Sequence, residues 1–167
     1  MKPRKFEPSF CEIKQEELVL SAEALASLMK LVLARGSKFR FRARGSSMHP
    51  FIKNDDVLTI TPVSLKELKT GDVIAFLRPG SGNPAVHRIV RLSDDVLITK
   101  GDNNRETDGS LPEESILGRI ELVERRGKKL RLGLGFEKLI IAFLTGHGLW
   151  LPIFRVAGFF FGFFAKR

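Results

Sequence analysis

Cysteine, histidine and long apolar runs are all scarce in this chain of 167 residues. Its single cysteine, Cys11, excludes an intrachain disulfide and leaves the redox compartment open. The three histidines, at positions 49, 87 and 147, do not have the spacing of metal ligands, so we expect no metal and no other cofactor. Residues Met1–Glu17 are polar and charged, without the apolar core of a secretory signal peptide.

The net charge of +9 is distributed unevenly along the chain. Residues 1–44 carry 10 Lys/Arg against 5 acidic residues, residues 45–124 carry 9 against 13, and residues 125–167 carry 9 against 1. A core that binds nucleic acid should itself be basic, because phosphate neutralisation drives that affinity, so we expect no nucleic-acid partner. The basic excess beside the apolar C-terminal end favours an anionic membrane surface, the alternative being a role in solubility only.

The N-terminal residues 1–36 form an extension in which one helix is predicted. The segment Glu16–Ala34 is rich in helix formers, and Gly36 stands where a helix C-cap is expected. Its apolar positions follow helical spacing: Leu18, Leu25, Leu28, Met29 and Val32.

Residues 37–132 show the pattern of a mainly β domain. Phe39–Arg44 alternates strictly between apolar and charged residues, as a half-buried strand does. Many short strands at close spacing predict an antiparallel barrel or sandwich. Further strands are predicted at Val57–Thr61, Asp72–Leu77, Val86–Leu92, Val96–Lys100, Ile116–Glu124 and Lys129–Leu132.

Residues 133–167 form a hydrophobic tail with basic flanks, which we predict to be helical. The uncharged run Leu139–Phe154 is only 16 residues long, whereas a membrane-spanning helix needs about 20 apolar residues. Arg155 then separates it from Val156–Ala165. Two short helices lying in a membrane interface therefore fit best, with folding back onto the domain or a partner, or a spanning helix, as alternatives.

Three polar residues are candidates for catalysis, although each alone has an ordinary structural explanation. Ser47 follows a strand at a Gly-Ser-Ser break, which is usually only a turn. His87 lies in an alternating strand, where a lone histidine is usually structural, although a histidine can accept a serine proton at neutral pH. Asp108 ends a polar loop six residues after Asp102, and either carboxylate could hold a histidine tautomer.

In combination these residues lie in four boxes that resemble type I signal peptidases. The resemblance is closest to the subgroup of the endoplasmic reticulum, archaea and some bacteria, in which histidine replaces the usual catalytic lysine, and it covers Phe39–Ile120. The boxes are Gly-Ser-Ser-Met-His-Pro at 45–50, Gly-Asp-Val-Ile-Ala-Phe at 71–76, Val-His-Arg at 86–88, and Thr-Lys-Gly-Asp-Asn-Asn at 99–104 with a later aspartate.

The resemblance implies a Ser-His-Asp serine endopeptidase on a β core shared by signal peptidases and repressor peptidases. It selects Ser47 over Ser46 as nucleophile and His87 as base. It selects Asp108 as the third member, with Asp102 as a structural residue and second choice. The backbone N–H of Ser47 would hold the oxyanion.

Two further expectations concern the residues around the nucleophile. Lysine-type relatives place a serine donor two residues before the nucleophile, where this chain has Gly45. Met48 and Pro50 would shape a substrate groove, or else fill the core and make a turn. The family binds an extended peptide by strand addition and selects small residues at the first and third positions before the cut.

The chain departs from the family pattern at its N-terminus, where a transmembrane helix is usual. Glu16–Ala34 is too charged and too short for one. The basic residues from Arg125 to Arg131 favour the cytoplasmic face of a membrane for the tail, which points to a cytoplasmic leader peptide as substrate or to tethering by a membrane-protein partner.

Three alternatives stay open from the sequence alone. One is a self-cleaving repressor-type peptidase, although such enzymes use a lysine base. Another is a non-catalytic peptide-binding module of the same fold. The third keeps the peptidase but makes Lys100 its base, which a requirement for deprotonation near pH 8–9 would indicate.

Overall fold

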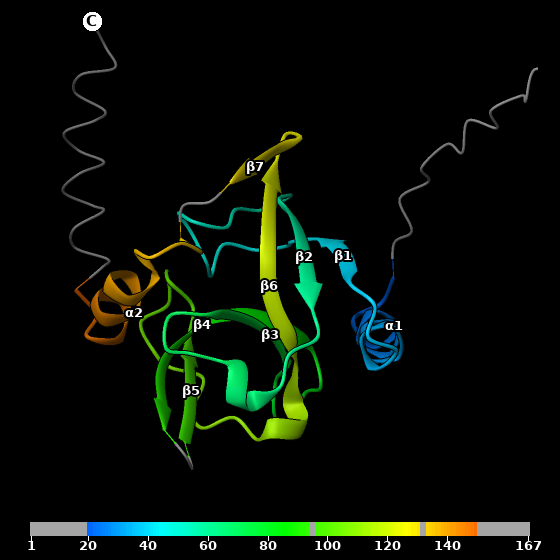
Figure 1. Ribbon diagram of the computed structural model, residues 1–167, viewed down its shortest axis with the longest axis horizontal. Coiled ribbons are helices and arrows are strands. Elements are labelled where there is room, and N and C mark those ends of the chain that lie inside the picture. The colour runs from blue at the N-terminus through cyan, green and yellow to red at the C-terminus, as the bar shows by residue number, and fades with distance from the viewer. Residues whose placement is uncertain (1–19, 94–95, 131–132, 150–167) are drawn as a thin grey trace, which may run out of the picture.

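The alternating segments of the sequence fold into one antiparallel sheet of seven strands (Figure 1). The computed structural model describes residues 20–93, 96–130 and 133–149. The order of strands is β1-β2-β6-β3-β4-β5, with β7 paired to β6. The strands are β1 (Phe39–Arg42), β2 (Val57–Thr61), β3 (Val73–Leu77), β4 (Pro84–Ser93), β5 (Val96–Lys100), β6 (Ile116–Arg125) and β7 (Lys128–Leu130), and the 3₁₀ turns are η1 (Leu65–Glu67) and η2 (Glu113–Ser115).

The prediction of a mainly β domain is confirmed, while β1, β3, β4, β6 and β7 differ from the predicted limits by one or two residues. The strand predicted from Phe39 to Arg44 ends at Arg42, because Ala43 is opposed by two residues. Ala43 donates its N–H to the Asp56 carbonyl and accepts a hydrogen bond from the N–H of Asp55, which interrupts the regular ladder. At the other limit, β4 begins earlier than predicted, since Pro84 pairs with Leu77.

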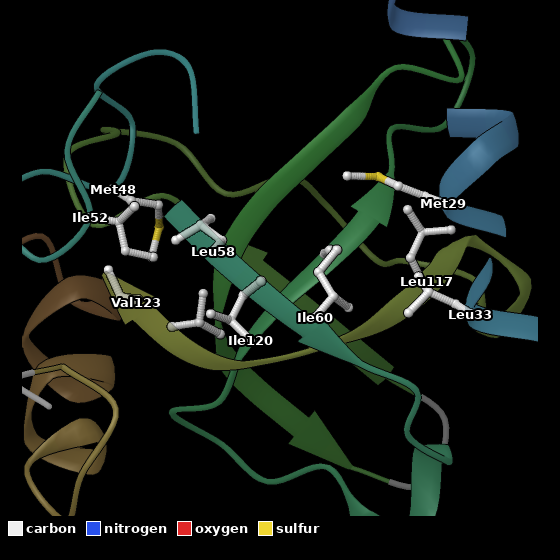
Figure 2. Close-up of a cluster of buried hydrophobic side chains, with 11 residues drawn as sticks. Met29, Leu33, Met48, Ile52, Leu58, Ile60, Leu117, Ile120 and Val123 are labelled. Carbon is white, nitrogen blue, oxygen red and sulfur yellow. The ribbon is translucent and has the colours of Figure 1, made fainter. Parts of the chain in front are cut away.

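The hydrophobic core consists of two clusters on opposite faces of β3. Val73 and Ala75 join the first cluster, whereas Ile74 and Phe76 join the second. Both faces of β3 are therefore buried, which explains its continuous apolar sequence. Figure 2 shows the first cluster, which draws on α1, the turn after β1 and strands β2 and β6: Met29, Leu33, Met48, Ile52, Leu58, Ile60, Leu117, Ile120 and Val123.

Helix α1 (Ala22–Ala34) packs against this first cluster. The helix begins after Ser21, whose hydroxyl accepts a hydrogen bond from the N–H of Ala24. The prediction that the helix includes Leu20 and Ser21 is therefore wrong, and residues 16–19 of the predicted helix lie outside the described residues. Gly36 follows the helix with a φ of 73°, the left-handed conformation that terminates helices.

Helix α2 (Lys138–Gly146) lies against β4 through one face only. Ile141, Ala142 and Thr145 are buried, whereas Ile140 and Phe143 are more than half exposed. The predicted tail is thus partly folded onto the domain, and its second helix, Val156–Ala165, lies outside the described residues. In the part of the chain that is described, no helix has the length and apolar character needed to cross a membrane.

We expect α1 to be an integral part of the folding unit, although it precedes the β domain in sequence. Met29→Ala should lower the free energy of unfolding by about 2–5 kcal/mol, because its side chain is buried in the first cluster. Leu31→Ala is the matched control, since Leu31 is 54% exposed on the same helix. Equal denaturant midpoints for the two variants would show that α1 is not anchored there.

Candidate active site

The structure brings Ser47, His87 and Asp108 into one hydrogen-bonded chain. His87 Nε2 lies 3.1 Å from Ser47 Oγ, and His87 Nδ1 lies 2.6 Å from Asp108 Oδ2. Ser47 comes from the turn after β1, His87 from β4, and Asp108 from the loop after β5. The imidazole is buried, with one edge of its ring toward the serine and the other toward the carboxylate.

The Asp108 carboxylate is held in place by Thr99 of β5. The Thr99 hydroxyl donates to Asp108 Oδ2 at 2.8 Å, and the Asp108 N–H donates to the Thr99 carbonyl at 2.9 Å. Burial alone would raise the pKa of this carboxyl. The hydrogen bonds from His87 and Thr99 and the positive charge of Arg78 outweigh burial and lower the pKa. The carboxylate therefore stays ionised as a partner for the imidazole at neutral pH.

The loop after β5 also fixes the backbone of the serine turn. The N–H of Asn103 donates to the Ser47 carbonyl at 2.7 Å, and the Asn103 side chain donates to the Ser46 carbonyl at 3.3 Å. Gly101 permits this approach, since a Cβ there would lie 2.7 Å from the Ser47 carbonyl oxygen. The serine is consequently placed by the same loop that supplies the carboxylate.

Asp102 is part of a different, fully buried ion pair. Both its oxygens accept hydrogen bonds from Arg88 at 2.8 Å, and the Thr145 hydroxyl of α2 donates to it at 3.3 Å. Arg88 also donates to the carbonyls of Gly71 and Gly133. The structure therefore places Asp108 against His87 and Asp102 against Arg88.

Lys100 lies on the face of the sheet opposite to His87. It pairs directly with Arg88 across β4 and β5, so the two side chains share a face. His87 precedes Arg88 and therefore faces the other side. This arrangement speaks against Lys100 as the base.

A groove of about 350 Å³ ends at Ser47 and His87. One wall is the run from Phe41 to Gly45 and the other is the run from Asn83 to His87. Of the two residues proposed to shape a groove, Met48 lies in its lining and Pro50 does not, while Ser46 contributes only its carbonyl to the contacts above. Its apolar part is completed by Ala22, Leu25, Met29, Ile52, Leu58 and Ala75.

Sequence reasoning missed Thr99, and it did not foresee what Arg88 would contact. Both stand beside residues that were singled out, Thr99 in the Thr-Lys-Gly-Asp box and Arg88 directly after His87. Their position in these boxes was the available signal, but their partners depend on the folded chain. Within residues 20–93, 96–130 and 133–149, no group of three or more His, Cys, Asp or Glu side chains is arranged to hold a metal ion.

Comparison with known proteins gives the family of this chain. The family model described as Peptidase S24-like matches residues 11–121. The chain belongs to this peptidase family. Its relatives confirm the predicted resemblance to signal peptidases of the endoplasmic-reticulum type.

The matching relatives are catalytic subunits of signal peptidase complexes. SEC11 of Lodderomyces elongisporus is 38% identical over 69 residues, covering 39% of this chain and 41% of the relative. SEC11C of Homo sapiens is 32% identical over 73 residues, covering 41% and 38%. SEC11 of Colletotrichum graminicola is 34% identical over 70 residues, covering 39% and 41%. The chain thus spans about two fifths of the length of these relatives.

The two aspartates should differ in what their removal does to stability. Asp102→Asn should lower the free energy of unfolding by about 3–5 kcal/mol, because it leaves the buried Arg88 charge without its partner. Asp108→Asn should cost less, about 1–3 kcal/mol, since it breaks a hydrogen bond to a histidine and does not isolate a buried guanidinium. Denaturant unfolding of both variants measures the difference.

Asp55→Asn serves as the control for this comparison. Asp55 pairs with Arg44 at the surface, so its replacement should leave the unfolding midpoint nearly unchanged. A larger loss for Asp108→Asn than for Asp102→Asn would contradict the assignment of the buried pair as the structural one.

Proposed function

We propose that this protein is a serine endopeptidase of the signal-peptidase type, which cleaves a signal or leader peptide after small residues. The observation that carries the proposal is the hydrogen-bonded chain from Ser47 through His87 to Asp108 at the end of a groove. Membership of the S24-like family supports it.

In this mechanism His87 accepts the proton of Ser47 through Nε2 as Oγ attacks the substrate carbonyl carbon. Nδ1 keeps its hydrogen and donates it to Asp108, which holds the tautomer and stabilises the imidazolium that forms. The imidazolium then protonates the leaving amine. Water, deprotonated by the same histidine, hydrolyses the acyl-enzyme and restores Ser47.

The backbone N–H of Ser47 is the donor we assign to the oxyanion. No hydrogen bond from this N–H is made to any residue that the structure describes. Gly45 supplies no side-chain donor, and its N–H is already used by the Asn54 side chain at 3.0 Å. A backbone donor held by the turn needs no reorganisation when charge develops on the substrate oxygen.

Two strand edges offer an extended peptide its backbone hydrogen bonds. On one wall, the N–H and carbonyl of Ala43 form hydrogen bonds with Asp56 and Asp55. Because backbone groups of successive strand residues point to opposite edges, the N–H and carbonyl of Arg44 point toward the groove. On the other wall, β4 pairs with β5 only from Arg88 onward, which leaves the edge of residues 84–87 open. A peptide between these edges would reach Ser47 in an extended conformation.

The geometry bears on the two other readings of the fold. A self-cleaving repressor-type peptidase would use a lysine base, whereas a histidine contacts the serine here. A non-catalytic binding module would have no need of the contact between Asp108 and His87. We therefore favour turnover of an external peptide.

The first experiment is cleavage of a peptide with an Ala-x-Ala site in detergent or liposomes. Ser47→Ala and His87→Ala should each lower kcat by about 10³-fold or more, and Asp108→Asn by a comparable factor, because the three act as a unit. Ser46→Ala is the matched control and should retain cleavage. Activity that persists in Ser47→Ala would reject the mechanism.

We also propose that the C-terminal region holds the enzyme at an anionic membrane surface. The outer face of α2 exposes large apolar side chains, and the sequence beyond it is apolar with basic flanks. A membrane-protein partner is a further proposal, since the relatives are named as subunits of a signal peptidase complex. The exposed face consists of Phe136, Leu139, Ile140, Phe143 and Leu149.

Sedimentation with vesicles of anionic and of zwitterionic lipid tests the membrane proposal. Leu139→Glu with Ile140→Glu should weaken binding to anionic vesicles at least tenfold, since it places two charges in the apolar face. Leu31→Glu, an exposed leucine on α1, should bind as the unmodified protein does. Binding unchanged in the double variant would exclude this face as the contact.

A further inference from the structure

The charged side chains that the described residues contribute to the groove all have the same sign. Among these residues its lining contains Arg42, Arg44, Lys53 and Arg78 and no aspartate or glutamate. Residues 45–124, which make up most of the β domain, carry 9 Lys/Arg against 13 acidic residues. The cations are therefore concentrated at the groove against the charge of the surrounding domain.

The cations of the groove differ in their direct contacts with the residues that the structure describes. Arg44 forms an exposed ion pair with Asp55 at 3.0 Å. By contrast, Lys53 and Arg78 are exposed and form no ion pair or side-chain hydrogen bond within residues 20–93, 96–130 and 133–149. They come from separate parts of the lining, Lys53 from the turn before β2 and Arg78 from the position after β3, so the groove carries two cations from different elements.

The positive charges of these side chains lower the pKa of titratable groups nearby. Burial and then the charges of Lys53 and Arg125 lower the pKa of His49, which adjoins the serine turn. At the other end, Arg78 adds to the interactions that hold the pKa of Asp108 down against the effect of burial. The cations thus act on both sides of the catalytic chain.

We propose that the groove selects peptides that carry acidic side chains beside a small residue at the cut, a specificity that rests on the proposed peptidase function. The apolar floor receives the small residue, and Lys53 and Arg78 pair with carboxylates that flank it. Cations on a cleft wall also raise the rate at which an oppositely charged peptide arrives. A peptide flanked by lysines would meet like charges in the groove.

The test compares three peptides with the same Ala-x-Ala core, flanked by glutamates, by glutamines or by lysines. For the unmodified protein at low salt, kcat/KM should be about tenfold higher with glutamate flanks than with glutamine flanks, from two exposed pairs of about 2- to 5-fold each. Lysine flanks should be the poorest. The preference should shrink in 0.5 M salt, because exposed pairs are screened.

Charge reversal identifies the side chains responsible. Lys53→Glu with Arg78→Glu should invert the preference, so that the lysine-flanked peptide becomes better than the glutamate-flanked one. Lys66→Glu with Lys69→Glu changes the net charge equally outside the groove and should leave the order of the peptides unchanged. Equal kcat/KM for the three peptides with the unmodified protein, or an order that survives the groove reversal, would overturn the inference while leaving the peptidase intact.

A second readout separates the inference from the proposed function. The dissociation constants of the three peptides for the Ser47→Ala variant, measured by fluorescence anisotropy, should follow the same order. If the unmodified protein cleaves none of the peptides, the peptidase proposal fails. The binding order then decides the inference, since tighter binding of the glutamate-flanked peptide upholds it and equal binding rejects it.

Discussion

The buried ion pair between Arg88 and Asp102 holds together the parts of the chain that build the site. Neither side chain is exposed, and Arg88 satisfies carbonyls before β3 and before α2 while Thr145 of α2 donates to Asp102. Loss of any of these partners would leave a buried charge or polar group unpaired, at a cost in free energy. The contacts therefore hold together β4, the loop after β5, the segments before β3 and before α2, and α2 itself. Asp102 lies in the loop that binds the Ser47 carbonyl through Asn103. The position of Ser47, the proposed nucleophile, therefore depends on an ion pair that does not contact Ser47 or His87.

Two aspartates of one loop, six residues apart, have different partners: Asp108 contacts His87 and Asp102 contacts Arg88. Thr99 draws Asp108 back onto β5 by two hydrogen bonds, one to its backbone and one to its carboxylate. Asp102 instead lies two residues after β5 and contacts the Arg88 guanidinium on the other face. Among the described residues, Asp108 forms its ion pair with His87 and none with an arginine, so its charge is directed at the imidazole.

The sequence predicts where the strands lie, but it does not predict which distant segments contact one another, because only the first depends on local pattern. Alternation and flanking turns are local, so β2 and β5 begin and end where predicted. The start of α1 depends on the Ser21 cap, and the packing of α2 on β4 depends on tertiary contacts. For the site, residue types and order pointed to Ser47, His87 and two aspartates. The resemblance selected Asp108 with Asp102 as second choice, and the folded chain places Asp108 against His87 and Asp102 against Arg88.

Consecutive residues of β4 serve opposite faces of the sheet, and this constrains how the site can vary. His87 faces the catalytic side beside Phe76, whereas Arg88 faces the buried pair. The pairing of β3 with β4 places Ile74 opposite His87 and Val73 opposite Arg88. A slip of one residue would turn an arginine toward the serine and leave Asp102 facing an imidazole. The register of β3 and β4 is consequently a condition for the contact between Ser47 and His87 as much as for folding, and the apolar cores on both faces of β3 enforce it.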